Sequence, residues 1–414
     1  MTYDPNGSIS GTPPIESTQF HTGDTVTVLR NTNLEEVWYS FAGWNTAPDQ
    51  TGNYYAAGST FIMGTSNVTL YAQWGGAVTT LAGTGSFGST NGVGTNASFN
   101  SPNDVAVDSG GYVYVADSGN NMIRKITPAG VVTTFAGTGE RGSANGPGAS
   151  ASFSDLGCLT VDSSGNIYVT DHQLIRKITP DDVVTTLAGS GAQGATNGPG
   201  SEASFNLPDG IAVDSFGIVY VADTYNNMIR KITPDGVVST IAGTGSYGFT
   251  NGPGASATFN EPMGIAVDTS GNLYVADGYN QVIRKITPDG TVSTFAGGGG
   301  GGPGDGSEGG VGSGFKNGHG TAAAFWDPWA IAVDSSGNLY VADVLNEQIR
   351  KITASGEVTS IAGAWPIING FYSPVEGSRN GVGPAATFAD PTGIAVDSSG
   401  NLYVSEMAMI RKIQ

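Results

Sequence analysis

The tetrapeptide Ile-Arg-Lys-Ile occurs six times in this chain of 414 residues, and its spacing constrains the fold more than any other feature. The six copies begin at residues 123, 175, 229, 283, 349 and 410. Each of the first five is followed, after a short turn, by a Val-x-Thr/Ser-x-Ala-Gly segment, whereas the last copy ends one residue before the C-terminus. A sixth such segment, Val78–Gly83, instead precedes the first copy. A repeat array permuted in this way predicts a closed ring in which the first strand completes the last unit.

Each repeat unit contains four short apolar segments, which we call strands a to d in chain order. In the fourth unit they are residues 262–268, 273–277, 282–286 and 292–296, with Gly, Asn or Pro between them. The 65 glycines, the low charged content of 12% and the absence of a sustained 3.6-residue period favour short strands and turns over helices. Four antiparallel strands per unit, repeated six times, predict an all-β fold, a six-bladed β-propeller whose sixth blade is completed by residues 78–82.

The net charge of −19 argues against several classes of partner. Twelve of the sixteen basic residues belong to the repeated Arg-Lys pairs, and the others are the scattered Arg30, Arg141, Lys316 and Arg379. No basic stripe is left for nucleic-acid binding. No apolar run is long enough to insert into a membrane. The single cysteine, Cys158, lies in an apolar strand, so the chain has neither an internal disulfide nor a Cys-based metal site.

Residues 1–74 do not follow the repeat. They contain Tyr-Asp-Pro-Asn-Gly at 3–7, Phe-Ala-Gly-Trp-Asn-Thr at 41–46 and Leu-Tyr-Ala-Gln-Trp at 70–74. Asp-Pro-Asn-Gly is a turn signal and the last segment alternates as a strand does. This part resembles the Listeria–Bacteroides repeat, a small β-grasp-like module of bacterial surface proteins, with its first strand truncated.

Residues 77–414 resemble the NHL-repeat family, whose members share the Pro-x-Gly-Ile-Ala-Val-Asp, Leu-Tyr-Val-Ala-Asp and Ile-Arg-Lys-Ile segments found here. Gly75-Gly76 is then the predicted linker between the two parts. The chain begins at Met1-Thr2-Tyr3, in mid-strand and without a secretory signal. We therefore expect a fragment of a longer or processed protein. The resemblances imply an extracellular or cell-surface location of the bacterial type.

Strand b ends on an acid in every unit, one short hairpin before the arginine of the tetrapeptide. A charged arginine packed between blades needs a partner to offset its desolvation. We therefore predict six structural ion pairs: Asp117–Arg124, Asp171–Arg176, Asp223–Arg230, Asp277–Arg284, Asp343–Arg350 and Glu406–Arg411.

The loop before strand a carries Asn-Gly-x-Gly-x-x-Ala-x-Phe in all six units, from Asn91–Phe99 to Asn380–Phe388. A phosphate-binding loop would need a following helix, and a dedicated calcium loop would need Asp-x-Asp spacing. Neither accompanies this motif. We interpret it as a structural turn whose phenylalanine anchors the loop between blades.

Strand direction alternates within a blade, so the d–a and b–c loops share one face, which we call the top face. A further set of acids lies there, just before strand a, at varying offsets: Asp104, Asp155, Asp209, Glu261, Asp327 and Asp390. Two readings remain open, a solvated acidic rim and a site for a cation such as calcium on the ring axis. Between these acids lie residues that differ from blade to blade, as the lining of a pocket does: Asn103, Met263, Trp329 and Thr392.

Two loops break the symmetry, a glycine-rich insert at 297–314 and an aromatic segment at 365–372. In or beside them lie Trp326, Trp329, Trp365, Phe371 and Tyr372. Exposed aromatic side chains in one sector suit a platform for protein or carbohydrate. The alternative is that they pack the enlarged loops themselves.

The residues favour a binding module over an enzyme. Related propellers include lyases and lactonases with a metal at the top centre, but His21, His172 and His319 are too few and too dispersed for a histidine-bound zinc. A calcium-dependent lactonase, esterase or lyase that uses Asn103 and the acids of the top face stays as the alternative. We expect a non-enzymatic adhesion or interaction module that binds protein or glycan near blades five and six and that could also self-assemble.

Overall fold

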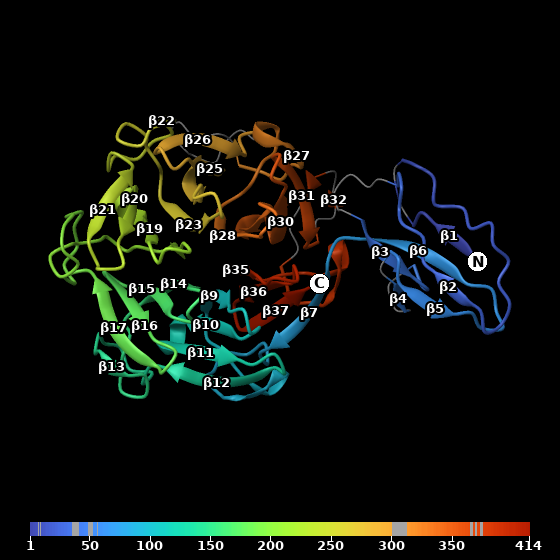
Figure 1. Cartoon of the computed structure of the whole chain (residues 1–414), viewed down its shortest axis with the longest axis horizontal. Coiled ribbons are helices and arrows are strands. Elements are labelled where there is room, and N and C mark those ends of the chain that lie inside the picture. Colours follow the sequence, from blue (N-terminus) through green and yellow to red (C-terminus); the bar gives the residue numbers. More distant parts are fainter. Residues whose placement is uncertain are drawn as a thin grey trace.

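The computed structural model describes residues 1–6, 8, 10–34, 41–48, 53–55, 57–299, 313–364, 367–368, 371–372 and 376–414. Within these residues the chain is all-β, with short 3₁₀ turns and no α-helix, as the sequence predicts. No described segment forms a helix of the length and apolarity that crossing a membrane requires. Figure 1 shows the strands of 77–414 arranged around a ring, with those of the N-terminal part beside it.

Six antiparallel sheets of four or five strands build the ring, and we number these blades in the order of their innermost strands. Blades one to three contain β9 (Pro102–Val107), β10 (Val113–Asp117), β11 (Met122–Ile126) and β12 (Val131–Ala136); β14 (Leu156–Val161), β15 (Ile167–Asp171), β16 (Leu174–Ile178) and β17 (Val183–Ala188); and β18 (Ile211–Val213), β19 (Val219–Asp223), β20 (Met228–Ile232) and β21 (Val238–Ala242). Blades four to six contain β23 (Pro262–Val267), β24 (Leu273–Asp277), β25 (Val282–Ile286) and β26 (Thr291–Ala296); β28 (Pro328–Val333), β29 (Leu339–Asp343), β30 (Gln348–Ile352) and β31 (Glu357–Ala362); and β35 (Gly393–Val396), β36 (Leu402–Glu406), β37 (Met409–Ile413) and β7 (Ala77–Ala82).

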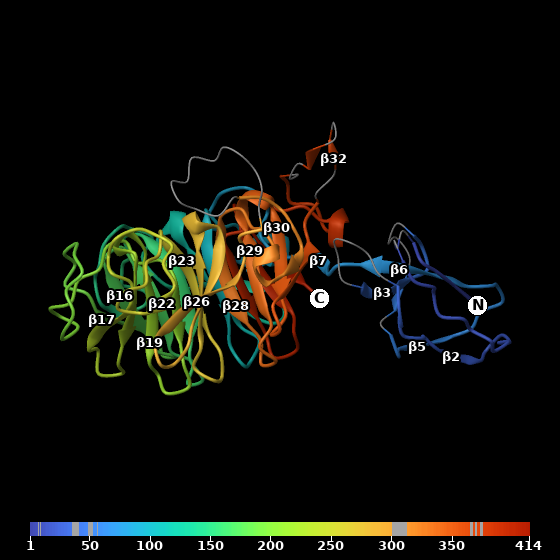
Figure 2. The same cartoon turned by 90° about the horizontal axis from the view of Figure 1, so that it is seen from above.

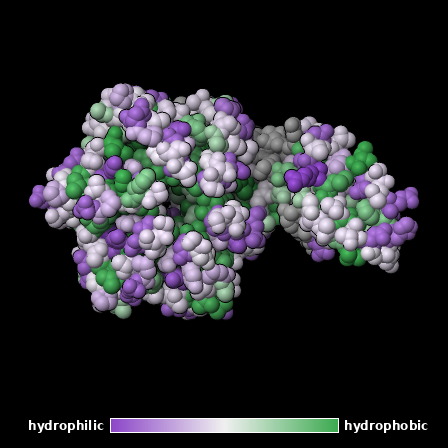
Figure 3. Space-filling view, in the orientation of Figure 1, coloured by the Kyte–Doolittle hydropathy of each residue, from purple (hydrophilic) through white to green (hydrophobic). Residues whose placement is uncertain are grey.

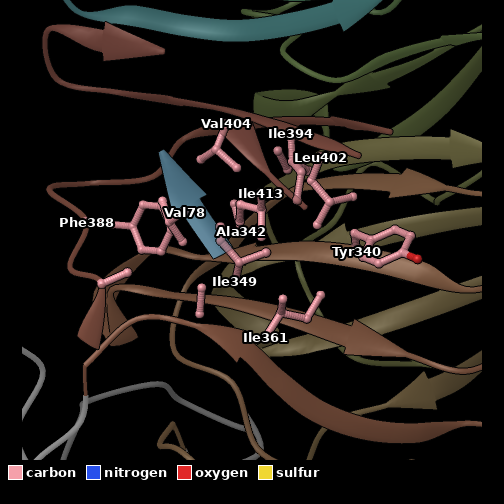
Figure 4. Close-up of a cluster of buried hydrophobic side chains, with 13 residues drawn as sticks. Val78, Tyr340, Ala342, Ile349, Ile361, Phe388, Ile394, Leu402, Val404 and Ile413 are labelled. Carbon is pink, nitrogen blue, oxygen red and sulfur yellow. The ribbon is translucent and has the colours of Figure 1, made fainter. Parts of the chain in front are cut away.

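The ring is closed by β7, as the permuted repeat predicts. Val78 pairs with Ile413 and Ala82 with Ile410, so the first strand of the array covers the edge of the last one. An open edge would otherwise expose unpaired backbone groups. Figure 4 shows Val78 among side chains of blades five and six, including Phe388 and Ile349.

Five blades also carry a short fifth strand that the repeat pattern did not indicate. These strands come from the Asn-Gly loops and pair with the outer strand of the blade that follows: β8 (Gly92–Val93), β13 (Gly146–Pro147), β22 (Gly252–Pro253), β27 (Gly318–His319) and β34 (Gly381–Val382). In blade three Gly198 makes a single bridge to Val238 instead. The loops thus protect the outer edges of the sheets.

The hydrophobic core is divided into six clusters, each shared by two neighbouring blades. Each cluster contains the phenylalanine of one Asn-Gly loop, and all six rings are fully buried: Phe99, Phe153, Phe205, Phe259, Phe325 and Phe388. The motif is therefore a structural anchor, as we interpreted it. Figure 2 shows the ring of blades from the side.

The N-terminal part folds around its own core. Its strands are β1 (Thr2–Asp4), β2 (Thr25–Thr27), β3 (Phe41–Asn45), β4 (Tyr54–Tyr55), β5 (Thr60–Ile62) and β6 (Thr69–Trp74), in sheets β1-β6-β3-β4 and β2-β5. The rings of Tyr3 and Trp44 meet edge-to-face at 4.6 Å inside this core.

The predicted linker Gly75-Gly76 is not a free hinge. Gly76 donates its N–H to the carbonyl of Ile361 at 2.8 Å and accepts from Gly383 N–H at 2.9 Å. A Cβ atom on Gly75 would lie 2.3 Å from the Gly383 Cα. Gly76 is therefore hydrogen-bonded to blades five and six, and the lack of a side chain on Gly75 permits its close approach to the Gly383 backbone.

One polar unit recurs in each blade, and we call it the arginine anchor. In blade four Arg284 is fully buried, and its Nη1 donates to Asp277 at 2.6 Å while its Nη2 donates to Asn251 of the Asn-Gly loop at 2.8 Å. The second oxygen of Asp277 accepts the N–H of Asn260, and the guanidinium lies 5.1 Å from the centre of the Phe259 ring. The arginine and the acid at the end of strand b lie 2.5 to 2.7 Å apart in all six blades. Among these pairs are Asp117–Arg124, Asp223–Arg230, Asp277–Arg284 and Asp343–Arg350.

Loss of one acid should destabilise the protein strongly. We expect Asp277→Asn to reduce the free energy of unfolding by about 3 to 5 kcal/mol, because it leaves the charge of Arg284 buried without a partner. Thermal and urea denaturation measure the change, with Asp235→Asn in an exposed turn as the matched control. The double variant Asp277→Asn/Arg284→Met should recover part of the loss. Equal unfolding midpoints for the Asp277→Asn and Asp235→Asn variants would contradict the role of the anchor.

Candidate functional site

The two faces of the disc differ in their loops. On the bottom face, strand a ends on an aspartate that caps its own turn, as Asp268 does by accepting the N–H groups of Ser270 and Asn272. These turns are short and nearly identical in all six blades. On the top face the same scaffold carries side chains that differ from blade to blade. Variation on a fixed scaffold is typical of a binding surface.

This variation lies at four sets of equivalent positions in the six blades, which we call rings. Three of them are defined by their distance in sequence from the proline that opens strand a, a position where blade two has Leu156. The outer ring, one residue before it, consists of Ser101, Asp155, Leu207, Glu261, Asp327 and Asp390. The mouth ring, one residue after it, consists of Asn103, Gly157, Asp209, Met263, Trp329 and Thr392. The channel ring, one residue further, consists of Asp104, Cys158, Gly210, Gly264, Ala330 and Gly393. The turn ring, at the exposed residue of each b–c turn, consists of Gly119, His172, Tyr225, Tyr279, Leu345 and Met407.

A cavity of about 310 Å³ opens on the top face. It is lined by the mouth-ring residues Asn103, Asp209, Met263 and Trp329 and, among others, by Tyr225 of the turn ring. The volume is at the lower end of the range for small-ligand pockets. Among the described residues no lysine or arginine lines it, so its charge comes from carboxylates. This combination of aromatic, thioether and acidic groups suits a neutral polar or cationic ligand.

Below the cavity a channel of about 270 Å³ runs between the innermost strands and is lined mostly by Val, Ile and Ala. Figure 3 shows the face of the disc in the orientation of Figure 1 as a mosaic of hydrophilic and hydrophobic residues around the hollow at the centre of the ring. Glycine at three positions of the channel ring lets the innermost strands of neighbouring blades approach closely. At Gly393, for example, a Cβ atom would lie 2.5 Å from the carboxylate of Asp104.

Asp104 and Asp209 meet Cys158 where the cavity joins the channel. The Cys158 thiol lies 3.6 Å from Asp209, whose Oδ1 also accepts from Asn103 at 3.4 Å. Asp104 accepts the backbone N–H of Leu159 at 3.0 Å. Burial raises the pKa of Asp104 to about 7, and the charge of Asp209 adds to this rise. Burial also raises the pKa of Asp209.

The indole N–H of Trp329 is a second polar group at this floor. Its Nε1 is buried and has no hydrogen-bond partner in the part of the chain that the structure describes. It lies close enough to Asp209 to oppose the rise in the pKa of that carboxyl, without reaching hydrogen-bond geometry. A buried N–H in this state can donate a hydrogen bond to an acceptor on a bound molecule.

The outer ring is held by bonds between neighbouring blades. Glu261 donates its N–H to Asn227 at 2.9 Å, and Asp327 donates to Gln281 at 2.6 Å. Both acids have left-handed backbone, with φ of 48° and 56°. This conformation costs a residue with a Cβ about 1 kcal/mol or more, which the bond to the preceding blade offsets. These bonds therefore fix the backbone positions from which the acids of this ring extend.

The six acids of the cation hypothesis do not gather at one point. Asp155, Glu261, Asp327 and Asp390 belong to the outer ring, whereas Asp209 is in the mouth ring and Asp104 in the channel ring. The described residues contain no group of three or more His, Cys, Asp or Glu side chains placed to hold a metal ion. The side chains of these six acids are therefore spread over three rings and do not converge on one calcium site on the axis.

The predicted aromatic platform is only partly in the described structure. Trp329 lines the cavity, while Trp326 is 37% exposed and lies outside its lining. Trp365 lies outside the described residues, and Phe371 and Tyr372 form the short strand β33 (Phe371–Tyr372) beside β32 (Ile367–Ile368). Most of the lining comes from blades one to three, whereas binding near blades five and six stays a prediction.

Sequence reasoning missed the turn ring. Tyr225 and Tyr279 are 52% and 51% exposed, and each is fixed by its backbone N–H, which donates to the carbonyl of Asn206 or Asn260. The signal was present, because this residue of the b–c turn changes between Gly, His, Tyr, Leu and Met from blade to blade. An alignment of the six units at their prolines would have found it.

Asp104 should make stability depend on pH. Its folded-state pKa of about 7 lies above the ordinary value of 3.8, so its contribution is complete at acidic pH and is lost as the pH rises through about 7. Between pH 5 and 8 we expect the free energy of unfolding of the native chain to fall by roughly 1 to 4 kcal/mol more than that of Asp104→Asn. This range follows from about 1.4 kcal/mol for each unit by which the pKa is shifted. Urea denaturation at both pH values measures this. The same fall in both proteins would show that Asp104 is not the responsible group.

Comparison with known proteins supports the fold. A family model described as the Listeria-Bacteroides repeat domain matches residues 1–73, and the NHL repeat model matches residues 99–126, 259–286 and 325–352. The Arabidopsis thaliana protein SUPPRESSOR OF QUENCHING 1 is 31% identical over 50% of this chain, and NHL repeat-containing protein 2 of Bos taurus is 28% identical over 70% of it. These matches span only 22% and 43% of the two relatives.

Solved structures share the architecture at low sequence identity. A protein of unknown function from Bacteroides thetaiotaomicron matches with a TM-score of 0.62 and 18% identity, over 94% of this chain and 86% of its own. An auxiliary nutrient binding protein of the same organism matches with a TM-score of 0.60 and 14% identity, over 86% and 82%. A putative gluconolactonase matches with a TM-score of 0.51 and 12% identity, over 82% and 92%. The chain thus combines a Listeria-Bacteroides repeat with NHL repeats that form a β-propeller.

Proposed function

We propose that this chain is a non-enzymatic, extracellular or cell-surface interaction module that binds protein or glycan through its top face. The observation that carries the proposal is the contrast between the faces. The arginine anchors, the buried phenylalanines and the bottom turns repeat from blade to blade, whereas the four top rings vary around a cavity of about 310 Å³. A surface with only a structural role would not need this variation.

Two comparisons support the location and the type of activity. The Listeria-Bacteroides repeat matched at residues 1–73 favours a surface protein, and a structural neighbour is named as a nutrient binding protein. We also propose that residues 1–74 and 77–414 are two domains that meet at Gly75-Gly76. The bonds of Gly76 to blades five and six would then hold the propeller in a fixed orientation to the first domain.

Binding should depend on Trp329. On glycan and peptide arrays, we expect the purified chain to show saturable binding to a subset of probes, and Trp329→Ala to weaken it about tenfold or more, because the ring offers apolar area to a ligand. Phe216→Ala is the matched control, since Phe216 is 81% exposed in a bottom turn. Light scattering on the same sample reports self-assembly. Unchanged affinity in a folded Trp329→Ala variant would contradict the site.

A metal-dependent lactonase, esterase or lyase is the alternative function. The observation in its favour is the pair Asp104 and Asp209, two buried carboxyl groups at the floor of an accessible cavity. Such pairs can exchange protons with a substrate. A screen of lactones and esters with and without added calcium separates the two functions. We expect no turnover above that of Asp209→Asn, whereas calcium-dependent turnover that Asp209→Asn abolishes would favour the enzyme.

A further inference from the structure

The sector of the top face over blades three to five has a chemistry of its own. The exposed tyrosines of the turn ring, Tyr225 and Tyr279, lie beside the outer-ring acids Glu261 and Asp327, because their turns are bonded to one another. Tyr279 donates its N–H to the carbonyl of Asn260, next to Glu261, and Asn227 and Gln281, each two residues after one of the tyrosines, accept the N–H groups of Glu261 and Asp327. The negative charge of Glu261 is the main cause of a raised pKa of the Tyr279 hydroxyl, with further contributions from Asp327 and Tyr225. These four side chains therefore form one electrostatic neighbourhood, which we call the acid–tyrosine sector.

The acids of this sector repel each other without a counterion. The pKa of Glu261 is raised by burial and by the charge of Asp327. None of the ion pairs among the described residues involves an outer-ring acid, because the tetrapeptide arginines are all committed to the anchors. Where the lysines of the tetrapeptides make ring contacts, they lie over aromatic rings of their own blades. Lys285, for example, lies 5.4 Å from the centre of the Tyr274 ring. A positive charge from outside would relieve this repulsion.

The sector also continues into the cavity. Tyr225 lines the cavity together with Met263 and Trp329, so one surface passes from the acids to the aromatic and thioether side of the cavity. Exposed tyrosine rings beside carboxylates suit a guanidinium or ammonium group, which binds ring faces and carboxylates together. Met263 and Trp329 suit an adjacent apolar side chain.

On this basis we propose that the acid–tyrosine sector docks a partner polypeptide through an arginine or lysine side chain whose apolar neighbour enters the cavity. This inference rests on the proposed function, since it assigns the class of partner to the same face. A neutral glycan would fill the cavity but would leave the repulsion between Glu261 and Asp327 in place. The charge therefore favours a basic polypeptide over a neutral saccharide.

The test uses the full chain and a displayed library of random dodecapeptides, followed by fluorescence anisotropy on the enriched peptides. We expect these peptides to combine arginine or lysine with an aromatic or aliphatic neighbour and to bind more weakly at high ionic strength. Tyr279→Ala and Glu261→Gln should each weaken binding about fivefold or more. The controls Phe216→Ala and Asp235→Asn, in exposed bottom turns, should change it less than about twofold.

Several results would overturn this inference. They are the absence of enrichment, enriched peptides without positive charge, and affinity that ignores both Tyr279→Ala and Glu261→Gln. If peptides fail while a neutral oligosaccharide binds in a Trp329-dependent manner, the proposed function stands and only the basic partner is lost. If neither peptides nor glycans bind, the proposed function itself is wrong.

Discussion

The buried arginine anchor is the interaction on which the rest of this structure depends. One guanidinium joins the end of strand b, the Asn-Gly loop and the phenylalanine that seals the interface between blades. Among the described residues the Nε atoms of the anchor arginines in blades one to four and six have no hydrogen-bond partner, so part of their desolvation stays uncompensated. The buried arginine is tolerated because the acid and the asparagine accept hydrogen bonds from its Nη atoms. This arrangement makes each blade intolerant of change at those positions.

The same anchors explain why the top face is free to vary. They fix where each d–a loop turns back into strand a, and the bonds between neighbouring blades fix the outer ring. Side chains of the mouth and turn rings contribute little to these anchors and bonds. Glu261, Met263 and Tyr279 occupy positions where blade one has Ser101, Asn103 and Gly119. Surface chemistry can therefore change without a matching change in the framework.

The sequence predicted the framework better than the site. Repeats with fixed spacing showed the propeller, its closure by Val78–Ala82 and the pairing of each arginine, because periodic packing leaves a periodic pattern. The acids before strand a were grouped by proximity in sequence, yet a shift of two residues, from one side of the proline to the other, moves a side chain from the outer ring to the mouth ring. Asp155 and Asp209 differ in this way. The volume of the cavity and its position over blades one to three depend on tertiary packing, which no local pattern records.

The central claim is that the anchors carry the fold while the top rings carry binding. The most direct measurement replaces the ring residues of blade four with those of blade one, in the variant Glu261→Ser/Met263→Asn/Tyr279→Gly. The account predicts a melting temperature close to that of the native chain together with loss of binding to peptides enriched on the native chain. A large fall in melting temperature would show that these residues support the fold. Undiminished binding in the folded variant would place the interaction elsewhere.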